Sequence, residues 1–248
     1  MTDWQHERHR FAYENEAKMI ADNFPDGNIK VLDIGCGTGY GSKILAGVAN
    51  EVIGLDNNSA ILPDDPNFRC WDVIPDDIPP SVDVIVANQF IEHLHEPALF
   101  LRKVSNSLKP GGTFFVSTPN QDFRLRPGEK PHNNQHTKEY GLSEFRHLLN
   151  EFFDDVSVYG VFAQKEIAKW EILRRVRIAI SLYDPPGLWA NEKIVNDLFS
   201  RIRPHVNTVI DEHNPAELDN PFDFRLITNP LDFPLDLVGV VHKEKDKI

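Results

Sequence analysis

Short apolar runs alternate with helical patterns along most of the chain. Seven runs have the length of buried strands, near residues 29–34, 51–55, 67–70, 82–87, 112–118, 156–162 and 237–241. Apolar residues recur every three to four positions from Leu94 to Leu108, which predicts a helix, and Leu142 to Phe153 predicts a second one. Strands that alternate with helices form βαβ units, so we predict an α/β fold that is Rossmann-like, doubly wound and mainly parallel.

A long interval, residues 163–234, separates the last two predicted strands. It holds two apolar helical stripes, near residues 167–180 and 194–202, on either side of a turn signal at 184–187. We therefore expect a core over residues 1–162, a mainly helical insertion over 163–234, and the last strand with a tail over 235–248. Basic residues, among them Arg174, Arg175 and Arg177, outnumber acidic ones in the first part of the insertion. This favours either a lid that meets a phosphate-bearing acceptor, or a solvated helix face packed on the core or on a second subunit.

A glycine-rich turn follows the first predicted strand. Asp33 ends the strand pattern, and glycines stand at 35, 37 and 39. Glycine permits unusual backbone dihedrals and a close approach to a ligand, and the unpaired N–H groups at a helix start favour polar or anionic ligand groups. The dinucleotide fingerprint would place a glycine at position 40, where this chain has Tyr40. The turn therefore predicts a nucleotide-type cofactor without a pyrophosphate.

Polar residues end the next three predicted strands. Asp56 and Asn57 follow the second strand, Asp72 and Val73 follow the third, and Asn88 follows the fourth. Because ligands in open α/β sheets bind outside the carboxyl ends of the strands, we expect these residues to share one crevice with the glycine turn. A carboxylate at 56 can hold ribose hydroxyls, and Asp72 can accept a hydrogen bond from an exocyclic amine such as that of adenine.

This combination resembles the class I S-adenosylmethionine-dependent methyltransferases over roughly residues 6–162. Shorter segments resemble a bacterial subgroup encoded with glycosyltransferases: Arg10–Glu14, Gly39–Ser42, Ile91–Leu94, Leu108–Gly112, Ser117–Asn120 and His136–Tyr140. The resemblance implies a seven-stranded sheet with an antiparallel last strand. It also implies that S-adenosylmethionine is bound by Asp33, Gly35, Gly37, Gly39, Asp56, Asn57, Asp72, Val73 and Asn88, with Arg10 as a partner of the methionine carboxylate. The chain departs from the family between residues 57 and 67, where prolines and acidic residues disfavour the usual helix.

Methyl transfer to a hydroxyl requires alignment and the removal of a proton, for which histidine is the usual base. His93 comes soon after the fourth strand and is the first candidate, with helix capping or cofactor positioning as its alternative role. His136 and His132 lie in the loop after the fifth strand, where His136 and Glu139 have either acceptor contact or a structural role. We predict no metal site, because the H-x-H and H-x-x-x-H pairs supply fewer ligands than zinc requires.

Composition narrows the function. The net charge of −12 over 248 residues argues against a nucleic-acid partner. Two cysteines and the lack of an apolar leader or membrane-spanning stretch predict a cytoplasmic protein. The resemblance to the bacterial subgroup implies a methyltransferase that acts on a hydroxyl of a sugar or glycan precursor, such as a nucleotide sugar or a lipid-linked glycan. The alternatives are an enzyme for an apolar metabolite (a quinone precursor, an acyl or a polyketide chain) and a regulatory protein that binds the cofactor without catalysis.

Overall fold

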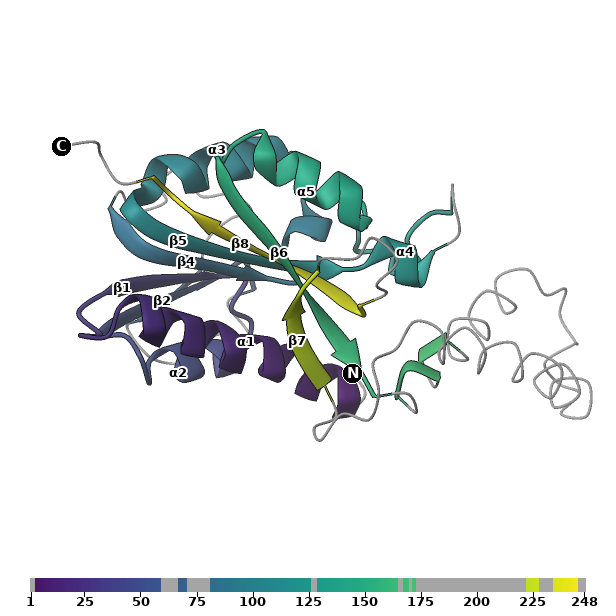
Figure 1. The fold of residues 1–248 in the computed structure, drawn as a ribbon, viewed down its shortest axis with the longest axis horizontal. Helices are drawn as coiled ribbons and strands as arrows, with labels where there is room; N and C mark the ends of the chain where they lie inside the picture. Colours follow the sequence, from purple (N-terminus) through teal and green to yellow (C-terminus); the bar gives the residue numbers. More distant parts are fainter. Residues whose placement is uncertain are drawn as a thin grey trace, which may run out of the picture.

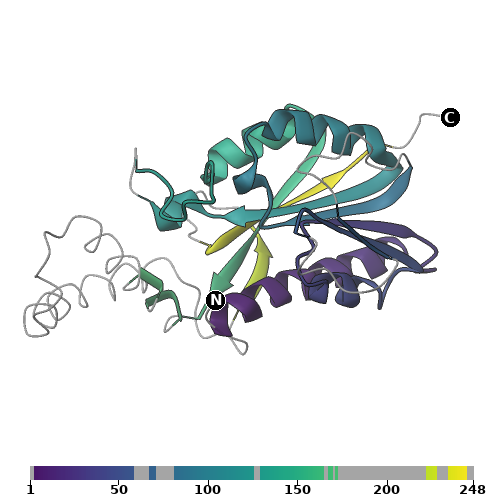
Figure 2. The ribbon, with the colours of Figure 1, turned by 180° about the vertical axis from the view of Figure 1, so that it is seen from behind.

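The computed structural model describes residues 3–58, 67–70, 81–125, 129–164, 167–169, 171–172, 222–227 and 234–244. These residues form a three-layer α/β/α structure around a twisted sheet (Figure 1). The sheet has eight strands in the order β3-β2-β1-β4-β5-β8-β6-β7. Helices α1 and α2 cover one face, and α3 and α5 cover the other (Figures 1 and 2).

The strands are β1 (Lys30–Ile34), β2 (Glu51–Asp56), β3 (Phe68–Cys70), β4 (Val82–Asn88), β5 (Leu108–Pro119), β6 (Asp155–Ala163), β7 (Phe222–Leu226) and β8 (Asp236–His242). The helices are α1 (Asp3–Asn23), α2 (Tyr40–Leu45), the 3₁₀ turn η1 (Ile91–His93), α3 (Pro97–Ser107), α4 (Gln121–Arg124) and α5 (Leu142–Asn150).

Both faces of the sheet are buried, as expected for a mainly parallel sheet between helices. Phe114 packs in one core cluster with Phe100 of α3 and Phe145 of α5. Its neighbour Phe115 belongs to the cluster on the opposite face, together with residues of α1 and α2. This alternation explains why the strands read as continuous apolar runs rather than as alternating patterns.

The predicted fold class is confirmed. Strands β1 to β5 pair in parallel, and β8 runs antiparallel between β5 and β6. Seven of the eight strands coincide with the predicted apolar runs. The eighth, β7, lies inside the interval expected to be mainly helical and pairs with β6. Its five residues alternate apolar and polar side chains, which is the pattern of an edge strand, but the run is short.

Helix α1 was also absent from the predicted elements, because its sequence is mostly polar. Its buried apolar residues include Tyr13, Ala17 and Ile20. Tyr13 fits against α2 at Gly41, where a Cβ would overlap the tyrosine ring. The middle of α1 is therefore held against the segment that follows the glycine turn.

Several predictions lie outside the described residues. Asp72 and Val73 are among them, as are nearly all of the two helical stripes of the insertion and most of the link between β2 and β3. Within the insertion, residues 167–169 and 171–172 are helical. Among the described helices, none has the combined length and apolar character needed to cross a bilayer.

Candidate functional site

The glycine turn between β1 and α2 has the backbone expected of a ligand-binding loop. Gly35, Gly37 and Gly39 have φ values of 76°, 54° and 75°, in the left-handed region that favours glycine. The N–H groups of Gly35 and Cys36 donate to the carbonyl oxygen of Leu55 at 2.7 and 3.0 Å, so the turn lies at the carboxyl end of β2. A Cβ on Gly37 would meet no atom within 4 Å. A ligand can therefore approach this part of the backbone closely.

Asp33 lies under the turn and is fully buried. Its carboxylate accepts hydrogen bonds from the hydroxyls of Tyr13 at 3.0 Å and Ser42 at 2.6 Å. Burial raises the pKa of Asp33 to about 6, against the opposing effect of these two hydroxyls. Asp33 therefore joins α1 and α2 to β1. We infer that it supports ligand binding indirectly, because it holds the glycine turn in place.

Asp56 stands beside the turn at the end of β2. One of its oxygens accepts the N–H of Gly37 at 2.9 Å, and the other accepts the N–H of Asn58 at 2.9 Å. Asp56 is half-buried and the adjacent Asn57 is exposed. The carboxylate is thus held next to the most open part of the turn.

A cavity of about 450 Å³ extends from the glycine turn to the loop that follows β5. Gly35, Cys36 and Gly37 line one end, together with Tyr40. The Tyr40 ring centroid lies 5.7 Å from those of Tyr13 and His6, so an aromatic wall stands where the dinucleotide fingerprint has a glycine. Burial raises the pKa of the Cys36 thiol, which disfavours a reactive thiolate.

Asn88 lines the middle of this cavity at the end of β4. Its side-chain amide donates to the carboxyl group of Glu16 on α1 at 2.7 Å. Glu16 is fully buried, and burial raises its pKa to about 8. The amide oxygen of Asn88 has no hydrogen-bond partner among the described residues, so it is available to a ligand.

Two histidines also line the cavity, His93 after β4 and His136 in the loop after β5. Nδ1 of His93 lies 3.0 Å from the carbonyl oxygen of Gln135, and Nδ1 of His136 lies 2.8 Å from Oε1 of Glu139. The two rings meet edge to face with centroids 4.8 Å apart. Because both acceptors fix the proton on Nδ1, each ring keeps the unprotonated Nε2 for a reactant. Burial lowers the pKa of His93, which favours its neutral form.

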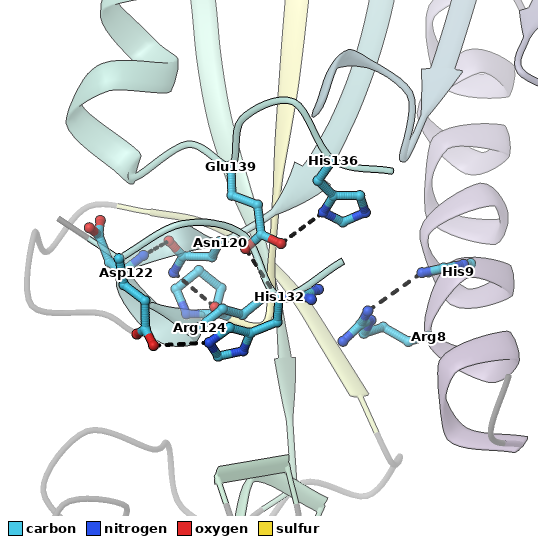
Figure 3. Close-up of polar contacts among 10 residues, drawn as sticks. Arg8, His9, Asn120, Asp122, Arg124, His132, His136 and Glu139 are labelled. Atoms are coloured by element: carbon cyan, nitrogen blue, oxygen red, sulfur yellow. Dashed lines mark hydrogen bonds and ion pairs between the residues drawn. The ribbon is translucent and has the colours of Figure 1, made fainter. Parts of the chain in front are cut away.

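Glu139 connects His136 to the rest of the loop. Its side chain is fully buried, and Oε2 lies 3.2 Å from Nε of Arg124 in α4. Figure 3 shows Glu139 between the histidine and the arginine. His132 pairs with Glu129 at 3.1 Å instead and does not line the cavity.

A model of the family described as a methyltransferase domain matches residues 2–165. The chain belongs to the methyltransferase-domain family.

The chain is also similar in sequence to two methyltransferases and in fold to a solved structure. A probable S-adenosylmethionine-dependent methyltransferase of Mycolicibacterium smegmatis is 37% identical over 164 residues, which cover 62% of this chain and 61% of that protein. A ubiquinone biosynthesis O-methyltransferase of Bradyrhizobium diazoefficiens is 32% identical over 108 residues, covering 40% of this chain and 43% of that protein. The plantazolicin methyltransferase BpumL in complex with SAH has a TM-score of 0.54 at 16% identity, covering 96% of this chain and 84% of that one. The chain thus matches less than two thirds of either relative's length.

The methyltransferase domain also contains a group of side chains that can hold a metal ion. Glu92, His93 and His136 each offer a ligand atom, and these atoms lie within 4.8 Å of one another. Two imidazoles and a carboxylate are suitable ligands for a divalent ion, although the sequence patterns alone predicted no metal.

The structure separates two arginines of α1 that are close in sequence. Arg10, the expected partner of the cofactor, has a side chain that is 68% exposed and pairs with Glu14 on the surface. Arg8 lines the cavity, with a side chain that is 7% exposed and lies 2.7 Å from Asp236 of β8. Once residues 3–23 are recognised as a helix, the three- to four-residue period places Arg8 on the buried face with Ala12 and Glu16. The geometry therefore favours Arg8 over Arg10 as a ligand-binding residue.

Substituting these two arginines is expected to affect stability very differently. Arg8→Gln leaves Asp236 buried without its cation, which should lower the free energy of unfolding by about 3–5 kcal/mol. Arg10→Gln removes only an exposed pair and should change it by less than about 0.5 kcal/mol. Urea denaturation of both variants measures the difference. Equal effects of the two substitutions would contradict the buried pair.

The buried carboxyl groups predict a dependence of stability on pH. Burial raises the pKa values of Glu16 and Glu92 from 4.5 to about 8, so the folded protein keeps protons that the unfolded chain has released. The folded state then binds more protons than the unfolded state, and the free energy of unfolding should fall as the pH rises from 6.5 to 8. Below 6.5, the partly buried His9, whose pKa is lowered to about 3, acts in the opposite direction.

Urea denaturation across this pH range tests the prediction. Glu92→Gln should flatten the pH dependence, because the amide cannot ionise. A control substitution of the exposed Glu151, Glu151→Gln, should leave the slope unchanged. A wild-type protein whose stability is constant from pH 6.5 to 8 would refute the assignment.

Proposed function

We propose that the protein is an S-adenosylmethionine-dependent methyltransferase that transfers a methyl group to a hydroxyl of a small-molecule acceptor. The observation that carries this proposal is one cavity that joins the three-glycine turn to the oriented pair His93 and His136. Family membership supports the reaction class.

The cofactor would occupy the end of the cavity at the glycine turn. Gly35, Gly37 and Gly39 allow the methionine and ribose portions to approach the backbone, and Asp56 with Asn57 is suited to the ribose hydroxyls. The unpartnered amide oxygen of Asn88 can accept a hydrogen bond from the ligand's ammonium group. Asp72 and Val73 stay predictions for the adenine edge. When bound, S-adenosylmethionine supplies an electrophilic methyl group.

His136 is our leading candidate for the general base. The buried carboxylate of Glu139 orients its ring and stabilises the imidazolium that forms when Nε2 takes the acceptor proton. His93 is oriented by a neutral carbonyl group, which compensates the developing charge less well. We therefore propose that His93 contacts the acceptor during proton transfer, while His136 takes the proton. A pair of oriented imidazoles in the cavity favours catalysis over a purely regulatory role.

The acceptor that fits best is polar. Arginine, histidine, asparagine and glutamine side chains line most of the cavity beyond the glycine turn. This supports the hydroxyl of a sugar or glycan precursor as the methylated group. The alternative is a quinone precursor, since one relative is a ubiquinone biosynthesis O-methyltransferase. The cytoplasmic location stays a prediction, and so does the alternative in which the insertion packs on a second subunit.

Calorimetric titration of the purified protein tests the proposal. S-adenosylmethionine and S-adenosylhomocysteine should bind with micromolar dissociation constants, and NAD should show no binding at the same concentrations. A folded protein that binds neither adenosyl compound would refute the proposed function.

A further inference from the structure

Two arginines from distant parts of the chain line the same section of the cavity. Arg8 belongs to α1 and Arg124 to α4, which follows β5. Both influence the same two groups: burial raises the pKa of Asp236 and both arginines oppose that effect, while both contribute to the lowered pKa of His9. Figure 3 shows the two side chains on either side of one region of the site. The two guanidinium groups therefore lie close enough to influence the same neighbouring groups, and a ligand between them could contact both.

Each arginine is held from behind by a buried carboxylate. Asp236 pairs with Arg8 at 2.7 Å and has a 3% exposed side chain, and Glu139 pairs with Arg124 at 3.2 Å and is fully buried. Neither carboxylate lines the cavity, whereas both arginines do. A guanidinium has five N–H donors in one plane, so a carboxylate on one side fixes the orientation of that plane toward the cavity.

The strongly basic side chains that line this part of the cavity contrast with the acidic composition of the whole chain. The protein carries a net charge of −12, yet Arg8 and Arg124 are the strong bases that line the cavity. Among the described residues that line it, Glu92 is the acidic residue that faces these two arginines. Two guanidinium groups thus face the cavity while the carboxylates that pair with them lie outside its lining, and such a surface favours an anionic ligand group.

The position of the pair assigns it to the acceptor rather than to the cofactor. The glycine turn follows β1, whereas Arg8 pairs with β8 and Arg124 follows β5. In the sheet, β4 and β5 lie between β1 and β8, and Arg124 and His136 both pair with Glu139.

We propose that Arg8 and Arg124 bind a carboxylate or phosphate group of the acceptor and so hold its hydroxyl near His136. This inference rests on the proposed methyltransferase function. It specifies an anionic acceptor, such as a sugar that carries a phosphate or a uronic acid, and makes a neutral sugar or quinone a poor substrate.

Three probes with the same ring test the proposal on protein saturated with S-adenosylhomocysteine: glucose 1-phosphate, glucuronate and glucose. Ligand-observed NMR at 150 mM salt should give a dissociation constant at least about tenfold lower for one of the anions than for glucose. Tighter binding of the phosphate assigns a phosphorylated acceptor, and tighter binding of glucuronate assigns a carboxylated one. Equal binding of all three probes would overturn the inference.

Substitutions of Arg8 and Arg124 test whether these residues cause the preference for anionic probes. Arg124→Gln and the double variant Arg8→Gln with Asp236→Asn should each abolish the anion preference, and the double variant avoids leaving a lone buried carboxylate. Arg102→Gln, at an exposed arginine of α3, should preserve it. Persistence of the preference in both cavity variants would contradict the proposal. So would a loss of S-adenosylhomocysteine affinity in the double variant, which would assign Arg8 to the cofactor.

These measurements distinguish failure of the proposed methyltransferase function from failure of the proposed anionic acceptor. A wild-type protein that does not bind S-adenosylhomocysteine refutes the proposed function itself. Binding of S-adenosylhomocysteine without an anion preference refutes only the anionic acceptor.

Discussion

Replacing His136 by alanine is expected to lower kcat by about 100- to 10,000-fold, which is the usual contribution of a general base. The dissociation constant for S-adenosylmethionine should stay within about twofold, because His136 comes from the loop after β5 and pairs with Glu139, whereas the glycine turn follows β1. Initial rates with an acceptor found by screening, together with calorimetry, measure both quantities. Glu139→Gln should also lower kcat, since an amide stabilises the imidazolium less well than a carboxylate does.

His147→Ala is the matched control, because His147 is an exposed histidine of α5 with a side chain that is 80% exposed. It should leave kcat unchanged. A His136→Ala enzyme with wild-type kcat would exclude His136 as the base. If His93→Ala alone then abolished turnover, the base would be His93, the residue that the sequence favoured first.

Replacing Asp56 by alanine should weaken the binding of S-adenosylmethionine and S-adenosylhomocysteine by about 100-fold. The carboxylate would contribute hydrogen bonds to both ribose hydroxyls, and bonds to a charged group contribute roughly 1.5–3 kcal/mol each. The loss should be the same for both compounds, because the ribose is far from the methyl group. Calorimetric titration gives the two dissociation constants directly.

Asp154→Ala provides the comparison at an exposed carboxylate between α5 and β6. Its affinities should match those of the wild type, and circular dichroism should show that both variants are folded. Wild-type affinity in Asp56→Ala would show that the cofactor does not use this end of the cavity.

The cofactor end of the site could be predicted from the sequence because its signals are local. The glycines at 35, 37 and 39 stand directly after a buried strand, and Asp56 ends the next one. Strand ends in a parallel sheet converge whatever the details of packing, so the topology places these residues together. The positive φ values of the three glycines are what the spacing predicts.

The rest of the site could not be predicted, because it depends on contacts between segments that are far apart in the sequence. Arg8 is recognised as a cavity residue only when the register of α1 on the sheet is known, and the polar sequence of α1 gives little indication of that register. The contact between Glu16 and Asn88 joins α1 to β4, and Asp236 comes from β8. The orientation of His136 depends on Glu139, three residues later, being fully buried by the surrounding loop.

The placement of β8 between β5 and β6 has a consequence for when the protein can become active during its synthesis. Until residues 236–242 have left the ribosome, β5 and β6 lack the partner that joins them, and Arg8 lacks its buried carboxylate. The glycine turn can form earlier, since it needs only β1, β2, α1 and α2. A nascent chain should therefore acquire the cofactor end first and the acceptor end last, and it should not methylate before the sheet is complete.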